Sequence, residues 1–140
     1  MVDGVDGESA QERVPEPEWP EHLPPRCPPD DAMPLDGIVY RFVTGAPVTP
    51  QDMKSHAQDE KAEGAEPCVR AGLSVFRDLA HVQFLLGTPR WLEHRIASAA
   101  LSPEHGKIKQ TGKARAKKHH TMWLRRSVIG TAHTLFEVLP

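Results

Sequence analysis

The chain has 140 residues and a net charge of −2, which allows a single domain and excludes a protein that is basic or acidic throughout. No apolar stretch exceeds four residues, so none is long enough to span a membrane. The acidic start lacks the apolar run of a signal peptide, and a cytoplasmic location is expected. Cys27 and Cys68 lie too far apart for a metal-binding pair, and we expect free thiols in a reducing compartment.

Composition divides the chain into two parts. Residues 1–36 carry a charge of −8 and hold 8 of the 14 prolines, whereas residues 37–140 carry +6 and most of the aliphatic side chains. A segment poor in apolar residues and rich in proline and charge does not form a core. The pattern predicts a disordered acidic arm over 1–36, followed by one compact domain over 37–140.

The first predicted elements follow Gly37. Residues 38–43 are β-branched or aromatic and predict a central strand. Thr49 followed by Pro50 is typical of a capped helix start, and this helix is expected to run to about residue 63. Residues 73–76 predict a short second strand.

Two helices are predicted next. The first has a helical apolar face that is formed by Leu79, Val82 and Leu86. The second begins at the Thr88–Pro89 pair, and its stripe comprises Leu92, Ile96, Ala99 and Ala100.

Strands are expected over residues 107–110, 120–124 and 134–139. Local strand pairs combined with helical crossovers favour the α+β class. We therefore predict one small domain with a mixed or antiparallel sheet and about three helices.

A basic segment spans Lys107 to Arg126, with eight lysines and arginines and no acid. Such a density of positive charge favours phosphate, and Trp123 or the adjacent histidines could stack on a base. The alternative is a solvated basic loop. The candidate polyanion-binding residues are Lys107, Lys109, Lys113, Arg115, Lys117, Lys118, His119, Trp123, Arg125 and Arg126.

Histidine chemistry in the same segment suggests a second function. His120 beside lysines would suit a general base for RNA cleavage or another phosphoryl reaction. The alternative is that His119 and His120 lie one inward and one outward on a strand. The sequence has no metal-binding spacing, and we predict neither a metal nor a cofactor site.

Arg41, Ser74 and Glu137 each lie on a predicted strand. Their order is similar to the arginine–serine–glutamate signature of ADP-ribosyltransferase-like folds. The resemblance implies that Arg41 holds NAD phosphates, Ser74 supports the site, and Glu137 stabilises the sugar transition state. The simpler interpretation is a structural ion pair between Arg41 and Glu137.

The sequence supports three hypotheses for the function. The first is a binding module that contacts RNA, DNA or another polyanion through the basic segment. The second is an enzyme acting on a phosphate-containing or nucleotide substrate. The third is a protein-interaction module in which Trp19 and Leu23 anchor the arm on a partner. The acidic arm is also expected to fold back over the basic segment, and the oligomeric state is left open.

Overall fold

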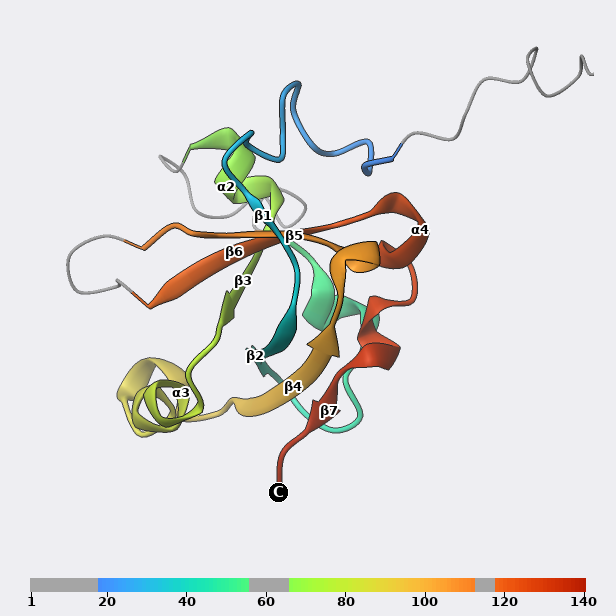
Figure 1. The fold of residues 1–140 in the computed structure, drawn as a ribbon. Helices are drawn as coiled ribbons and strands as arrows, with labels where there is room; N and C mark the ends of the chain where they lie inside the picture. Colours follow the sequence, from blue (N-terminus) through green and yellow to red (C-terminus); the bar gives the residue numbers. More distant parts are fainter. Residues whose placement is uncertain (1–17, 56–65, 113–117) are drawn as a thin grey trace, which may run out of the picture.

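The computed structural model describes residues 18–55, 66–112 and 118–140. Within these residues, seven strands form one antiparallel sheet and three α-helices accompany it (Figure 1), in the order β1-β5-β6-β3-β2-β4-β7. This is a single α+β domain, and the predicted fold class is confirmed.

The strands are β1 (Met33–Pro34), β2 (Gly37–Val43), β3 (Leu73–Phe76), β4 (Arg95–Leu101), β5 (Gly106–Gln110), β6 (His119–Leu124) and β7 (Glu137–Val138). The helices are α2 (Pro67–Ala71), α3 (Leu79–Leu86) and α4 (Arg126–Ile129). Short 3₁₀ turns are η1 (Pro50–Met53), η2 (Pro89–Trp91), η3 (Pro103–His105) and η5 (Ala132–Leu135).

One face of the sheet is covered by the inner core. Alternate residues of the strands, such as Val39 and Val43 on β2 and Met122 on β6, point to this face and are fully buried. Leu35 from the N-terminal segment and Ala132 and Phe136 from the C-terminal segment close it. The inner core is therefore built from both ends of the described chain.

The opposite face carries two smaller apolar clusters. The disulfide cluster comprises Cys27, Ala32, Cys68 and Trp123, with Trp19 and Leu23 packed against it. The α3 cluster comprises Phe76, Val82 and Ile96, with partly buried side chains from α3 and β2 around them. Polar residues of β3 and β6 lie on this same face, and they position the site described below.

The helix predicted from Thr88 to Ala100 is wrong. Only the turn η2 is helical, and residues 95–101 form β4, which pairs with β2 along its whole length. The apolar spacing of Ile96, Ala99 and Ala100 fitted a helix. In the sheet, Ala97, Ala99 and Leu101 face the inner core, because strand pairing overrides the helical preference of alanine.

The helix predicted over 49–63 is also shorter than expected. Its start is confirmed, because Thr49 and Asp52 form a capping box around η1, but Lys54 is already extended. Residues 56–63 lie outside the described residues. The strand predicted over 134–139 is limited to β7, because η5 occupies the preceding residues.

The N-terminal segment departs most from the expectation. Residues 1–17 lie outside the described part, but residues 18–36 pack on the domain, and Cys27 forms a disulfide with Cys68. The prediction of free thiols is wrong, and the described part of the arm is not separate from the domain. Disulfides persist in oxidising compartments, so one ground for a cytoplasmic location is removed.

Two arm acids pair with the basic segment, Asp31 with Lys109 and Glu18 with Arg125, which confirms that the arm folds back. Trp19 and Leu23, the expected partner anchors, contact the disulfide cluster of their own chain. In the part of the chain described, no helix has the length and apolar character needed to cross a membrane.

Candidate functional site

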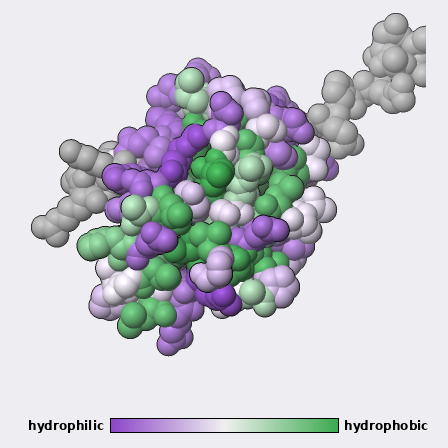
Figure 2. Space-filling view, turned by 60° about the horizontal axis from the view of Figure 1, so that its bottom comes forward, coloured by the Kyte–Doolittle hydropathy of each residue, from purple (hydrophilic) through white to green (hydrophobic). Residues whose placement is uncertain are grey.

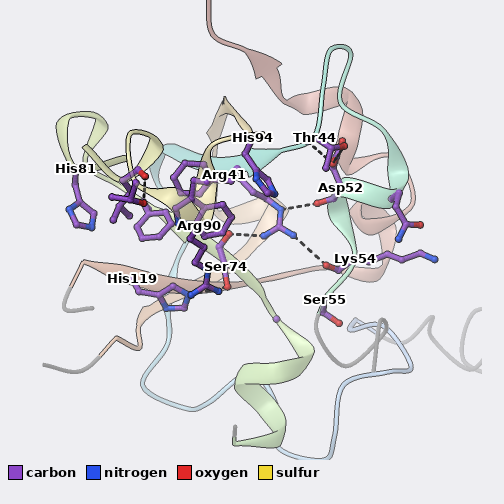
Figure 3. A pocket seen from close by; sticks show the side chains of 17 residues that line it. Arg41, Thr44, Asp52, Lys54, Ser55, Ser74, His81, Arg90, His94 and His119 are labelled. Atoms are coloured by element: carbon purple, nitrogen blue, oxygen red, sulfur yellow. Dashed lines mark hydrogen bonds between the residues drawn. The ribbon is translucent and has the colours of Figure 1, made fainter. Parts of the chain in front are cut away.

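A cavity of about 850 Å³ opens between the α3 cluster and the disulfide cluster. Its walls are the ends of β2 and β3, the start of β6, the segment around η1, and the α3–η2 region. Figure 3 shows Arg41 at its centre, with Ser74 and His119 on one side and Asp52 and Lys54 on the other. A cavity of this size is typical of small-molecule sites.

A chain of polar contacts, the polar row, begins at Ser74 and His119 in the cavity and continues to Thr111 and Thr121, which do not line it. Ser74 lies opposite Thr121 and His119 lies opposite Phe76 in the β3–β6 register, so Ser74 and His119 are diagonal neighbours on one face. Ser74 Oγ is 2.9 Å from His119 Nε2, and His119 Nδ1 is 3.0 Å from Thr111 Oγ1. Thr111 Oγ1 lies 2.8 Å from Thr121 Oγ1, which is buried.

Gly72 allows the polar row to be this compact. A Cβ atom at position 72 would lie 2.3 Å from Thr121 Cγ2 and 2.9 Å from Trp123 Nε1. A larger residue would therefore push the start of β3 away from β6, and with it Ser74 away from His119.

Arg41 fastens three segments of backbone around the cavity. Its guanidinium donates to the carbonyl oxygens of Ser74 at 2.6 Å, Asp52 at 3.0 Å and Lys54 at 3.3 Å (Figure 3). The single residue pair in the β2–β3 register is Tyr40 with Phe76 in the described chain. Arg41 thus joins β2 to β3 where their direct pairing has ended.

Asp52 accepts hydrogen bonds from Thr44 and Thr49, each through its backbone amide and its hydroxyl, at 2.9–3.2 Å. Partial burial raises the pKa of Asp52, but these hydrogen bonds outweigh burial and hold the pKa below its usual value. The loop therefore supplies all the described hydrogen bonds to this carboxylate. Its negative charge does little to neutralise Arg41 and Arg90 in the cavity.

An aromatic wall faces the polar row. Phe42 and Trp91 stack with ring centroids 4.1 Å apart and an interplanar angle of 12°, and the His94 ring lies edge-on to Trp91 at 4.9 Å. His94 Nδ1 is the one buried side-chain nitrogen or oxygen without a hydrogen-bond partner among the described residues. Such a buried atom without a partner is unusual in a folded protein.

Arg90 extends from η2 along this wall. Its guanidinium carbon is 5.0 Å from the centroid of the Trp91 ring, and Figure 3 shows the side chain running toward Ser74 and His119. Within the described residues it forms no ion pair. Its charge is therefore available to an anion in the cavity.

Apolar surface gathers on the side of the molecule that carries α3 (Figure 2). Phe84 and Leu92 are 72% and 68% exposed there. The cavity thus combines a polar floor with an apolar surround.

The structure separates the predicted polyanion-binding residues. Trp123 is buried and donates its Nε1–H to the carbonyl of Cys68 at 2.9 Å, so it does not face outward as stacking on a base would require. His119 lies in the cavity. Lys107 is partly exposed on β5 and Arg126 is exposed on α4, while Lys113, Arg115 and Lys117 lie outside the described residues.

Other bases of the segment are paired with acids. Lys109 and Arg125 contact the arm acids described above, and Lys118 Nζ lies 2.6 Å from Asp78 Oδ2. The Lys118 hydrogen bond is the main reason that the pKa of Asp78 lies below its usual value. Asp78 also caps α3 through the His81 amide, so this ion pair links the hairpin to that helix.

The structure also places only some of the predicted catalytic candidates in the cavity. Arg41 and Ser74 line the cavity, whereas His120 does not: its Nδ1 contacts the Lys118 carbonyl, and its register partner is Val75 of the inner core. Glu137 is exposed on β7 and lies opposite Ser98, whose partner on β2 is Tyr40. Glu137 is therefore in register with Tyr40 of the α3 cluster, whereas Arg41 alternates with Tyr40 and leaves β2 on the side of Val39 and Val43. The predicted ion pair between Arg41 and Glu137 is absent from the described residues.

Sequence reasoning missed Arg90, Trp91, His94 and Thr111. The first three were assigned to the helix that the structure replaces with η2 and β4. Thr111 gave no signal, because its contact depends on how β5 and β6 are aligned.

Among the described residues, no three histidine, cysteine or acidic side chains are grouped closely enough to hold a metal ion. Comparison with protein families, with curated proteins and with solved structures finds no match for this chain.

Proposed function

We propose that the cavity binds a phosphate-bearing ligand with a planar ring, a combination found in a nucleotide or at the end of a nucleic-acid strand. The observation that carries the proposal is a guanidinium without an acidic partner beside a ring stack in one cavity. Arg90 forms no ion pair among the described residues, and its guanidinium carbon lies 5.0 Å from the centroid of the Trp91 ring, which stacks on Phe42.

Charge supports an anionic ligand. Arg41, Arg90 and Lys54 line the cavity, while its acid Asp52 is held by Thr44 and Thr49. Arginine is well suited to phosphate because its planar guanidinium forms paired hydrogen bonds to two oxygens.

Ring stacking supports a base-like group on the same ligand. The Phe42–Trp91 stack presents flat apolar surface next to Arg90, and every nucleobase can stack on such a surface. Stacking contributes about 1–3 kcal/mol per base, so that it complements the phosphate contact.

The basic segment extends this site. His119 belongs to that segment and lines the cavity, and its carbonyl accepts the Gly112 amide at 3.1 Å. The proposal therefore joins ligand binding in the cavity with the polyanion binding that the sequence predicts for the basic segment.

The test measures fluorescence anisotropy of the full chain with two probes. One is a fluorescent ADP analogue, and the other is a 5′-phosphorylated single-stranded RNA labelled at its 3′ end. Arg90→Ala should weaken both by about tenfold or more, because a hydrogen bond to a charged group contributes about 1.5–3 kcal/mol. Arg95→Ala is the matched control, since Arg95 is exposed and does not line the cavity.

Three results would overturn the proposal. The first is that neither probe binds, and the second is that Arg90→Ala and Arg95→Ala both keep the affinity of the unaltered chain. RNA binding that is unaffected by Arg90→Ala but falls steeply between about 50 and about 200 mM salt would assign binding to the basic segment alone.

A further inference from the structure

The contact between Ser74 and His119 has the geometry of a nucleophile and its base. Their separation of 2.9 Å lies within hydrogen-bond reach, and the base is oriented by a third group, Thr111, at 3.0 Å. Because both ring nitrogens of His119 are held, the imidazole is fixed with Nε2 toward Ser74. Both residues are partly exposed to the cavity, so a substrate can reach them.

The hydroxyl chain supports the proton arrangement that this role needs. With a proton on His119 Nδ1, that nitrogen donates to Thr111, and Thr111 in turn donates to the buried Thr121. Nε2 then carries a lone pair and accepts the hydrogen bond from the Ser74 hydroxyl.

We propose that Ser74 and His119 hydrolyse a phosphate ester bound in the cavity, with Ser74 as nucleophile and His119 as general base. This inference rests on the proposed function, because the cavity must first bind the phosphate. His119 Nε2 takes the Ser74 proton while Oγ forms a bond to phosphorus. The bond from phosphorus to the ester oxygen breaks with its electron pair, and the departing oxygen takes the proton from His119.

Water completes the reaction. It attacks the phosphorus of the phosphoserine and gives a proton to His119, the bond from phosphorus to Oγ breaks, and Oγ takes that proton back. Arg90 stabilises the charge on the non-bridging oxygens. Arg41 holds Ser74 in place through its carbonyl, at 2.6 Å.

The chain contains a second serine–histidine contact that serves as an internal control. Ser102 Oγ lies 3.2 Å from His105 Nδ1, but that nitrogen also accepts the Ser102 amide at 2.9 Å in the cap of η3. Neither residue lines the cavity. Reactivity at Ser74 but not at Ser102 would therefore reflect the site rather than proximity of serine to histidine.

The experiment treats the full chain with an alkyl fluorophosphonate, which transfers its phosphonyl group to an activated serine as fluoride leaves. Peptide mass spectrometry should place the adduct on Ser74. His119→Gln should slow labelling by about 100-fold or more, the usual contribution of a general base. Ser102→Ala should label at the unaltered rate. Thr111 is a positioning residue, so Thr111→Val should slow labelling and Thr111→Ser should restore it.

Binding of the fluorescent ADP analogue separates this inference from the proposed function. His119→Gln that binds the analogue but no longer labels supports the nucleophile–base pair and shows that the protein is folded. An unaltered chain that binds the analogue while Ser74 stays unlabelled overturns the inference and leaves the proposed function intact. Equal labelling of Ser74 in the unaltered chain and in His119→Gln also overturns it.

Discussion

The two faces of the sheet differ in how they are filled. On one face, side chains such as Val75 and Met122, which are both fully buried, form a continuous apolar core. On the other, the polar row separates the disulfide cluster from the α3 cluster, and a cavity remains between them. The same strands supply both faces, since Met122 follows Thr121 directly.

The two faces therefore contribute differently to the stability of the fold and to its possible chemistry. The inner core removes apolar surface from water and leaves no polar group to react, whereas the opposite face keeps hydroxyl, imidazole and guanidinium groups accessible. The cavity there is bordered by the ends of β2 and β3, the start of β6, the segment around η1 and the α3–η2 region. We therefore expect substitutions on the two faces to lower the free energy of unfolding by different amounts.

The largest effect is expected at the disulfide, which fastens the arm over the cavity face. Replacing both Cys27 and Cys68 with serine should lower the free energy of unfolding by about 4 kcal/mol, because a loop of 41 residues is no longer closed in the unfolded chain. Urea unfolding measures this. The unaltered chain under reducing conditions is the control and should match the variant, and an unchanged midpoint on reduction would contradict the prediction.

A smaller effect is expected in the inner core. Met122→Ala should cost about 3 kcal/mol, because it leaves a cavity beneath the sheet where the side chain is fully buried. Ser74→Ala, on the neighbouring strand and opposite face, should cost about 1 kcal/mol or less, since it loses one partly exposed hydrogen bond. Equal losses in urea unfolding would show that the two faces do not differ as described.

The smallest effect on stability is expected at Asp52, in the loop beside the cavity, and it depends on pH. The lowered pKa of Asp52 means that its stabilisation is complete at neutral pH and is lost as the pH falls below about 4. Asp52→Asn should therefore cost about 1 kcal/mol at pH 7, the usual effect of losing a cap. The difference in thermal stability from the unaltered chain should narrow at about pH 3. A difference that persists there would exclude the charge of Asp52 as its source.

Local signals predicted much of the fold. The β-branched run at 38–43 and the helical apolar face of Leu79, Val82 and Leu86 depend on nearby residues, and both elements are confirmed. Strand β4 was missed because its alanines suit a helix, and only pairing with β2 and β7 makes it a strand. The disulfide was missed because the proline-rich arm had no local feature showing that it lies on α2.

The site was harder to predict for a related reason. Ser74 and His119 were each noted, but their contact depends on the β3–β6 register, and a shift of one residue would have placed His120 there instead. Arg41 was expected to meet the acid Glu137, yet it binds backbone carbonyls, which are present in every segment and leave no mark in the sequence.

The edges of the sheet carry a consequence for solubility. Within the described residues, both outermost strands, β1 and β7, are only two residues long. Pro34 on β1 has no amide hydrogen to donate, and β7 presents the exposed charge of Glu137. Short, charged or proline-containing edges are poor templates for an incoming strand. The protein can therefore keep an open cavity and exposed apolar residues on one face while its sheet resists growth into fibrils.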